Sequence, residues 1–141
     1  MIPAVCNTSA IPEKYKKDYH SWEQNREAAI LSVKACDLFF NNYMDNPEKD
    51  GKGQMFSPML WETGHKGLPP AYFQICGKDP LRYEAFIYER ILREEVGIKT
   101  KVDAYGGLPH GYWSIFPQLE ASKKFVADSV EGIKWLLAQK A

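Results

Sequence analysis

Apolar and polar residues follow the clearest pattern in the second half of the chain. Residues 71–76 (Ala-Tyr-Phe-Gln-Ile-Cys) form a continuous β-prone run, which is typical of a strand covered on both faces. Gly77 ends this run, and Asp79-Pro80 predicts a helix start, with the acid as N-cap and the proline at the first helical position. Gly97 stops the predicted helix. Its apolar residues predict a single buried stripe: Leu81, Ala85, Tyr88, Leu92 and Val96.

A second strand and a second helix follow. Residues 99–105 alternate between apolar and charged positions, which favours a strand at the edge of a sheet. After a loop at Gly106–Gly111, an amphipathic helix is expected over about residues 119–139, burying Phe125 or Val126, Val130, Ile133 and Leu137. This order of elements indicates a βαβ unit with parallel strands and a right-handed crossover. Ligands gather at the carboxyl ends of such strands, which lead here into residues 77–79 and 106–113.

The first half of the chain is less regular. Ile2–Cys6 predicts one brief strand, residues 13–26 predict helical turns, and residues 45–53 predict a solvated loop. A helix is expected over about residues 34–44, with one apolar face: Val33, Cys36, Phe40, Tyr43 and Met44. The predicted fold class is α/β, a short and mostly parallel sheet of about three strands flanked by helices. Residues 1–56 would hold the brief strand and cap-like helices, and residues 57–141 the strand-helix-strand-helix part, in a single domain.

Composition narrows the functional classes. Eighteen basic and eighteen acidic residues give a formal net charge of zero, which argues against nucleic acid as a partner. No apolar run approaches the roughly 18–20 residues of a membrane span, and the N-terminus lacks the pattern of a signal peptide. Three cysteines stand at no metal-like spacing. We therefore expect a soluble cytoplasmic protein with reduced thiols and neither metal nor cofactor.

Two residues are the main candidates for catalysis. His110 lies in a loop of glycine, proline and aromatic residues, and Asp79 follows the neighbouring strand, where a carboxylate can fix the imidazole tautomer and leave the other nitrogen as a base. Two simpler interpretations stay open, a helix cap for Asp79 and an ordinary loop histidine for His110. Glu62 or Glu84 could replace Asp79, and Cys76 is more consistent with inert core than with a nucleophile. Aromatic residues of the loop either line an apolar pocket or pack the loop onto the sheet: Tyr112, Trp113 and Phe116.

The motifs at these two positions also resemble a known family. Residues 77–85 (Gly-Lys-Asp-Pro-Leu-Arg-Tyr-Glu-Ala) and 107–113 (Gly-Leu-Pro-His-Gly-Tyr-Trp) resemble the C-terminal part of α/β-hydrolases. The branch is that of the hormone-sensitive-lipase-like esterases, particularly fungal members, and residues 12–15, 21–25 and 63–70 are similar to it as well. The resemblance implies that Asp79 is the triad acid and His110 the triad base. It places Tyr83 and Leu108 at the substrate pocket.

The chain departs from that family in three places. Tyr83 stands where the family usually has Asp, and Gly106 where Pro is common, so the rim of the pocket is expected to differ. The nucleophile motif Gly-x-Ser-x-Gly and the oxyanion loop are absent from these residues, which would correspond to about the last three strands of the family's sheet. Losing the inner neighbour of the first strand exposes a hydrogen-bonding edge, which predicts self-association, in the first instance a homodimer.

Three functions follow from this truncated α/β-hydrolase fold. The favoured one is an enzyme whose His110–Asp79 pair transfers a proton on a small apolar or aromatic biosynthetic intermediate, as in an isomerisation, cyclisation or elimination, without a serine. The second is the C-terminal half of a split carboxylesterase or lipase, completed by another chain. The third is a non-catalytic remnant.

Overall fold

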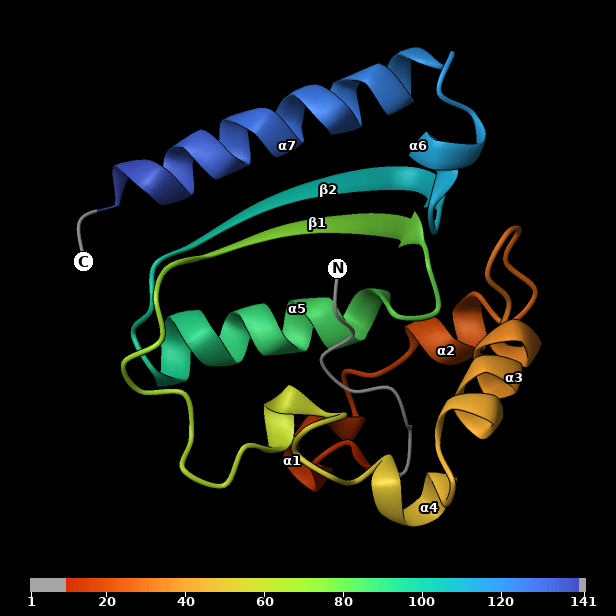
Figure 1. Cartoon of the computed structure of the whole chain (residues 1–141), viewed down its shortest axis with the longest axis vertical. Helices are drawn as coiled ribbons and strands as arrows, with labels where there is room; N and C mark the ends of the chain where they lie inside the picture. Colours follow the sequence, from red (N-terminus) through yellow and green to blue (C-terminus); the bar gives the residue numbers. More distant parts are fainter. Residues whose placement is uncertain (1–9, 140–141) are drawn as a thin grey trace.

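Two parallel strands form the centre of the structure. The computed structural model describes residues 10–139, without the side chains of residues 47 and 48. Strand β1 (Ala71–Lys78) pairs with β2 (Thr100–Pro109), beginning with Ala71 opposite Thr100. In the chain, the two strands are connected by α5 (Arg82–Arg90), which continues as a π-helical segment, Ile91–Glu95. The predicted βαβ unit is therefore confirmed, and the expected strand at Ile2–Cys6 lies outside the described residues (Figure 1).

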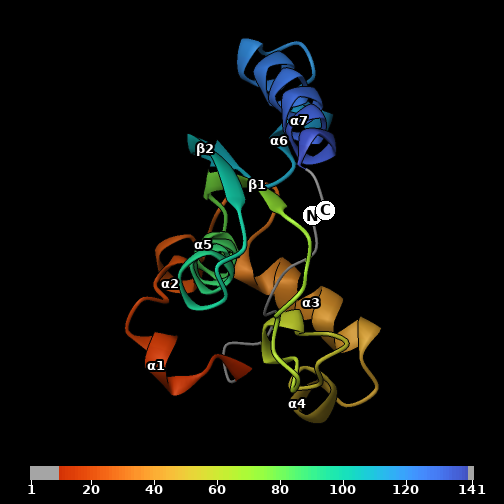
Figure 2. The same ribbon diagram turned by 90° about the vertical axis from the view of Figure 1, so that its left-hand side faces the viewer.

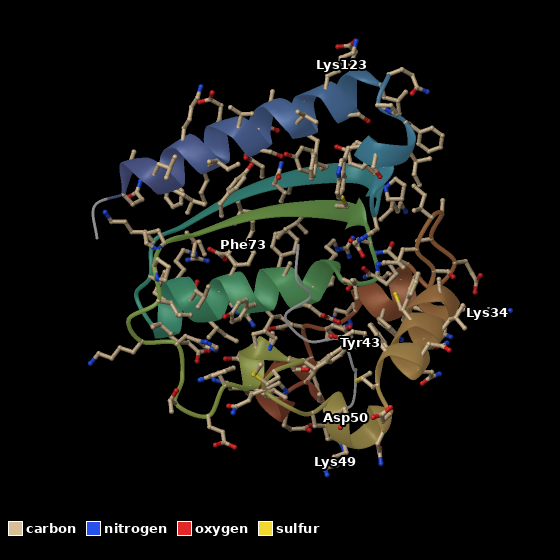
Figure 3. All side chains as sticks on the ribbon, in the orientation of Figure 1. Lys34, Tyr43, Lys49, Asp50, Phe73 and Lys123 are labelled. Atoms are coloured by element: carbon tan, nitrogen blue, oxygen red, sulfur yellow. The ribbon has the colours of Figure 1, made fainter. Side chains whose placement is uncertain are left out.

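Helices cover both faces of this sheet. The long helix α7 (Glu120–Ala138) lies on one face, and α5 lies on the other (Figures 1 and 2). The short helix α6 (Tyr112–Ile115) connects β2 to α7. Phe73 extends from β1 toward α5 (Figure 3), where its ring meets that of Tyr88 edge-on at a centroid distance of 6.3 Å. Among the described residues, no helix combines the length and the apolar character needed to cross a membrane.

The N-terminal helices lie beyond α5, on the side away from α7 (Figure 2). They are α1 (Glu13–Lys16), α2 (Ser21–Gln24), α3 (Val33–Tyr43) and α4 (Pro47–Asp50), followed by a 3₁₀ turn at Pro58–Leu60. The Ser32 hydroxyl caps α3 by accepting a hydrogen bond from the Ala35 N–H at 3.2 Å. Helix α4 interrupts the stretch that was expected to be only a solvated loop.

The apolar face of α3 is narrower than expected. Val33, Cys36 and Met44 are buried, but Phe40 is half-buried and Tyr43 is 79% exposed. The α5 prediction also needs correction, because Ile87 and Ile91 are among its most buried residues and neither belongs to the predicted stripe. Helix α5 packs against the N-terminal segment as well as the sheet, and a single stripe therefore does not describe its buried surface.

Helix α7 presents a different face to the sheet from the one expected. Phe125 is buried as predicted, whereas the other predicted core residues are about half or more exposed: Val126 55%, Val130 47%, Ile133 55% and Leu137 81%. Small residues, Ser122 and Gly132, are buried on this helix instead. A Cβ at Gly132 would lie 2.0 Å from the Tyr72 ring, so a side chain at this position would have to displace the ring or the helix. An apolar stripe of α7 is therefore left uncovered by the described residues.

A bulge at the carboxyl end of the sheet shapes the site. Cys76 is opposite Tyr105, but Lys78 is opposite Pro109, so two steps along β1 correspond to four along β2. The strands approach so closely here that a Cβ at Gly77 would lie 2.9 Å from the Gly107 nitrogen. Both strands thus run further than predicted: β1 passes through Gly77, and β2 includes most of the expected Gly106–Gly111 loop. The extra length of β2 brings His110 level with the residue that follows β1.

Candidate active site

The structure brings His110 and Asp79 into direct contact. Asp79 comes directly after β1 and His110 directly after β2, at the carboxyl edge of the sheet. The His110 Nδ1 lies 2.7 Å from the Asp79 Oδ2. The side chain of Asp79 is 3% exposed, whereas that of His110 is 31% exposed. The carboxylate is therefore sheltered, and part of the imidazole faces outward.

Asp79 uses its two oxygens for two different tasks. Oδ1 accepts a hydrogen bond from the Leu81 N–H at 2.9 Å, while Oδ2 accepts from His110. The expected N-cap role of Asp79 is wrong, because α5 begins three residues later, at Arg82, with Leu81 at the N-cap position and no side-chain cap. The Asp79 carboxylate instead closes the turn before the helix while it also contacts the imidazole. With Nδ1 donating to a carboxylate, a neutral imidazole keeps its lone pair on Nε2. Within the described residues, Nε2 makes no hydrogen bond. The arrangement is chemically able to accept a proton at Nε2.

Aromatic residues surround the histidine loop. The Trp113 ring stacks on Phe125 at a centroid distance of 3.8 Å and lies 6.4 Å from the His110 ring. Tyr112 is 1% exposed within the core, and burial this complete leaves no surface for a substrate to contact. Leu108 packs against the same core, and Phe116 is 42% exposed. A pocket-lining role for Leu108, Trp113 and Phe116 stays a prediction.

Tyr83 lies apart from this group. It packs against the core on the α5 side, where its ring meets that of His20 edge-on at 5.9 Å. Together with Asp18 and Arg90 it lines a separate cavity of about 410 Å³. The structure therefore does not bring Tyr83 into contact with His110, and its predicted place at the pocket rim stays a prediction.

The competing candidates occupy other positions. Glu84 is 1% exposed and accepts a hydrogen bond from the Tyr19 hydroxyl at 2.8 Å, while Glu62 is exposed, so Asp79 is the acid that contacts His110. His65 lies beside Tyr88. Burial raises the pKa of the Cys76 thiol to about 12, which keeps it protonated near neutrality and unsuited to be a nucleophile. The described part of the chain contains no cluster of three or more potential metal ligands.

Two residues that support the acid were not identified from the sequence. The Asn25 side-chain amide donates to the Asp79 carbonyl at 2.9 Å, and the Ser21 hydroxyl donates to the Pro80 carbonyl at 2.6 Å. Both residues are buried and come from α2 or its C-terminal end. They fix the backbone of Asp79 from across more than fifty residues of sequence. Only the family resemblance of residues 21–25 gave a signal for them.

Comparison with known proteins decides the family. A family model described as alpha/beta hydrolase fold matches residues 3–114. The chain belongs to the α/β-hydrolase family. Within it the chain falls in the hormone-sensitive-lipase-like branch, as the Asp and His motifs imply. Its parallel strands and flanking helices are the corresponding part of an α/β-hydrolase fold.

The relatives of this α/β-hydrolase chain include fungal proteins. It is 36% identical over 138 residues to an AB hydrolase superfamily protein of Schizosaccharomyces pombe, covering 98% of this chain and 39% of that protein. It is 38% identical over 140 residues to the versiconal hemiacetal acetate esterase of Dothistroma septosporum, and the match covers 99% of this chain and 41% of that protein. The chain thus spans about two fifths of the length of these relatives.

Solved structures agree with this assignment. The structure of vibralactone cyclase is 37% identical and superposes with a TM-score of 0.85, covering 94% of this chain and 37% of that one. An esterase of Pyrobaculum calidifontis is 26% identical with a TM-score of 0.75, and the match covers 84% of this chain and 38% of that one.

Proposed function

We propose that this chain supplies the general base and its orienting acid to an enzyme that acts on small organic esters. His110 takes the proton of the attacking nucleophile at Nε2 and returns it to the leaving group, and Asp79 holds the imidazole in the required tautomer. The observation that carries the proposal is the 2.7 Å contact between a sheltered carboxylate and a half-buried imidazole. Esterase names among the relatives support this substrate class.

The nucleophile and the oxyanion donors would come from polypeptide beyond these 141 residues. The chain spans about two fifths of its esterase relatives, and it contains no Gly-x-Ser-x-Gly. Either a longer protein that includes these residues or a second chain meets this requirement. The uncovered apolar stripe of α7 (Val126, Val130, Ile133 and Leu137) is the kind of surface on which such polypeptide would pack.

A second function is proton transfer by the pair alone. One observation favours it, namely the TM-score of 0.85 with a protein named as a cyclase. Here His110 would remove a proton from carbon or oxygen of a small intermediate and deliver it elsewhere on the same molecule, with no covalent enzyme intermediate. This function requires no serine, and it is the one that the sequence alone favoured.

The test uses the tagged protein purified from its own cells, with any polypeptide that accompanies it. We expect His110→Gln and Asp79→Asn to lower the hydrolysis of p-nitrophenyl esters about 10²–10⁴-fold. His20→Gln, a change at an exposed histidine, is the matched control and should leave the rate unchanged. Full activity of His110→Gln would contradict a role for this imidazole.

A fluorophosphonate probe then separates the two functions. A labelled serine on a longer polypeptide or on an accompanying chain supports the ester-processing enzyme. Turnover that depends on His110 without any labelled serine supports proton transfer by the pair alone.

A further inference from the structure

One residue beside the histidine loop has an unusual backbone conformation. Ile30 has a φ of 73°, and among the described residues it is the only non-glycine residue with a positive φ. A β-branched side chain clashes with the backbone in this region, which makes such a residue a genuine outlier. Strain of this kind persists only where the surrounding structure imposes it, and it occurs often at functional sites.

The strain is located in a tight turn. The Leu31 N–H donates to the Ala29 carbonyl at 2.9 Å, which closes a three-residue turn centred on Ile30. Turns of this size with a positive central φ are rare and strained. Glycine adopts this conformation at no steric cost, and the chain nevertheless has isoleucine here.

Hydrogen bonds hold both ends of the turn. On one side, Asn25 donates to the Asp79 carbonyl, and the Val33 N–H donates to the Arg26 carbonyl at 3.0 Å. On the other side, Ser32 caps α3. The turn is therefore fixed relative to the triad acid, and it rises toward α6 in Figure 1.

The Ile30 side chain reaches the residue after His110. Its Cγ2 lies 4.0 Å from the position of a Cβ built on Gly111, and Gly111 precedes α6. The residue is nevertheless 41% exposed, so burial in a core does not account for the strained backbone. An apolar side chain is thus held, partly exposed, next to the catalytic loop.

We propose that Ile30 is a specificity-determining residue, which forms an apolar wall beside His110 for the hydrocarbon part of the substrate. The inference rests on the proposed function and adds to it, because it states that the enzyme discriminates among substrates by hydrocarbon chain length at this position. Residues 24, 25 and 27–29, which lead into the turn, also line a cavity of about 340 Å³ with Lys78, Gly107 and Pro109. Lys78 and Pro109 directly precede Asp79 and His110 in the sequence.

Thermal unfolding distinguishes strain from packing. Ile30→Gly and Ile30→Ala both remove the apolar wall, but only glycine relieves the positive φ. We expect Ile30→Gly to melt higher than Ile30→Ala, and at least as high as the unchanged protein. If Ile30→Gly instead melts as low as Ile30→Ala and below the unchanged protein, Ile30 is a packing residue and the inference is wrong.

Ester kinetics test the role itself, on the tagged protein from its own cells. We expect both Ile30 variants to change the ratio of kcat/KM for p-nitrophenyl octanoate and p-nitrophenyl acetate by at least about tenfold. Leu68→Ala, at an exposed apolar residue in the loop before β1, is the control and should not change that ratio. An unchanged ratio in both Ile30 variants, with His110→Gln inactive, overturns the inference and leaves the proposed function in place. If His110→Gln keeps full activity, the proposed function fails instead.

Discussion

Gly77 is the residue on which the relative position of Asp79 and His110 most directly depends. It lies in the last part of β1, where the bulged β2 comes so close that no side chain fits between the two backbones. Asp79 follows two residues later. A side chain at position 77 would push the ends of the two strands apart, and with them the acid and the base.

We therefore expect Gly77→Ala to destabilise the protein and to separate the pair. The added Cβ would lie 2.9 Å from the Gly107 nitrogen and 3.1 Å from the Gly106 Cα, both of them backbone atoms that cannot move independently. A cost of about 1–3 kcal/mol in the free energy of unfolding is typical of such overpacking, and urea denaturation measures it. Gly106→Ala is the matched control, because a Cβ there meets nothing within 4 Å. Equal stability of the two variants would contradict the close approach.

At the scale of elements, α7 shows how a helix can bury its less apolar face. Ser122, Phe125 and Gly132 are its buried residues, and the hydroxyl groups on this side make hydrogen bonds. The Ser122 hydroxyl donates to the Phe116 carbonyl at 2.7 Å, and the Ser129 hydroxyl donates to Gln74 Oε1 at 2.8 Å. The small side chains let the helix approach closely, which a stripe of Val and Ile would prevent.

Truncating two adjacent side chains of α7 should therefore change the free energy of unfolding by very different amounts. Phe125 is 7% exposed and stacks on Trp113, so Phe125→Ala should lower the free energy of unfolding by about 3–5 kcal/mol. Val126 is 55% exposed in the single chain, so at concentrations where the chain is monomeric Val126→Ala should change the free energy of unfolding by no more than about 0.5 kcal/mol. Urea denaturation of the purified chain measures both. A larger loss for Val126→Ala than for Phe125→Ala would show that the helix is rotated.

The sequence was sufficient for local structure and for the pair, and insufficient for long-range placement. Periodicity predicted α3, α7 and the βαβ unit, and glycine, proline and the loop composition directed attention to Asp79 and His110. It could not predict the buried face of α7, because the apolar stripe is only one of two faces and the sheet selects the other. The supporting contacts of Ser21 and Asn25 cross 59 and 54 residues, and no local pattern encodes them. The bulge depends on backbone contact at Gly77, which leaves no periodic signal.

At the scale of the whole molecule, two buried thiols predict sensitivity to alkali. Burial raises the pKa of Cys36 and of Cys76 from 9.0 to about 12. Above pH 9 the unfolded chain loses both thiol protons while the folded chain keeps them, so the free energy of unfolding falls as the pH rises. The slope is about 1.4 kcal/mol per pH unit for each thiol.

Urea denaturation between about pH 8 and about pH 10 measures this slope. The double variant Cys36→Ala/Cys76→Ala should lose stability less steeply over the same interval, whatever its stability at pH 8. The tyrosines are present in both proteins and cancel in the comparison. Identical slopes would mean that the thiols ionise as easily in the folded chain as in the unfolded chain.

The uncovered stripe of α7 predicts association of the isolated chain. Val126, Val130, Ile133 and Leu137 are exposed together along one helix, and apolar patches of this kind mark interaction surfaces. We expect the purified 141-residue chain to form a homodimer, and Val130→Glu/Ile133→Glu to shift it toward the monomer. Sedimentation velocity over a range of concentrations measures both. A wild-type chain that is monomeric throughout would contradict this prediction.

The acid and the base lie 31 residues apart, within one strand-helix-strand unit. Their contact therefore depends first on the pairing of two consecutive strands, and Ser21 and Asn25 fix the Asp79 backbone from the preceding segment. The pair is thus carried by one contiguous stretch of the sequence. Any polypeptide that contributes a serine then has to align one hydroxyl with an imidazole whose orientation is already set.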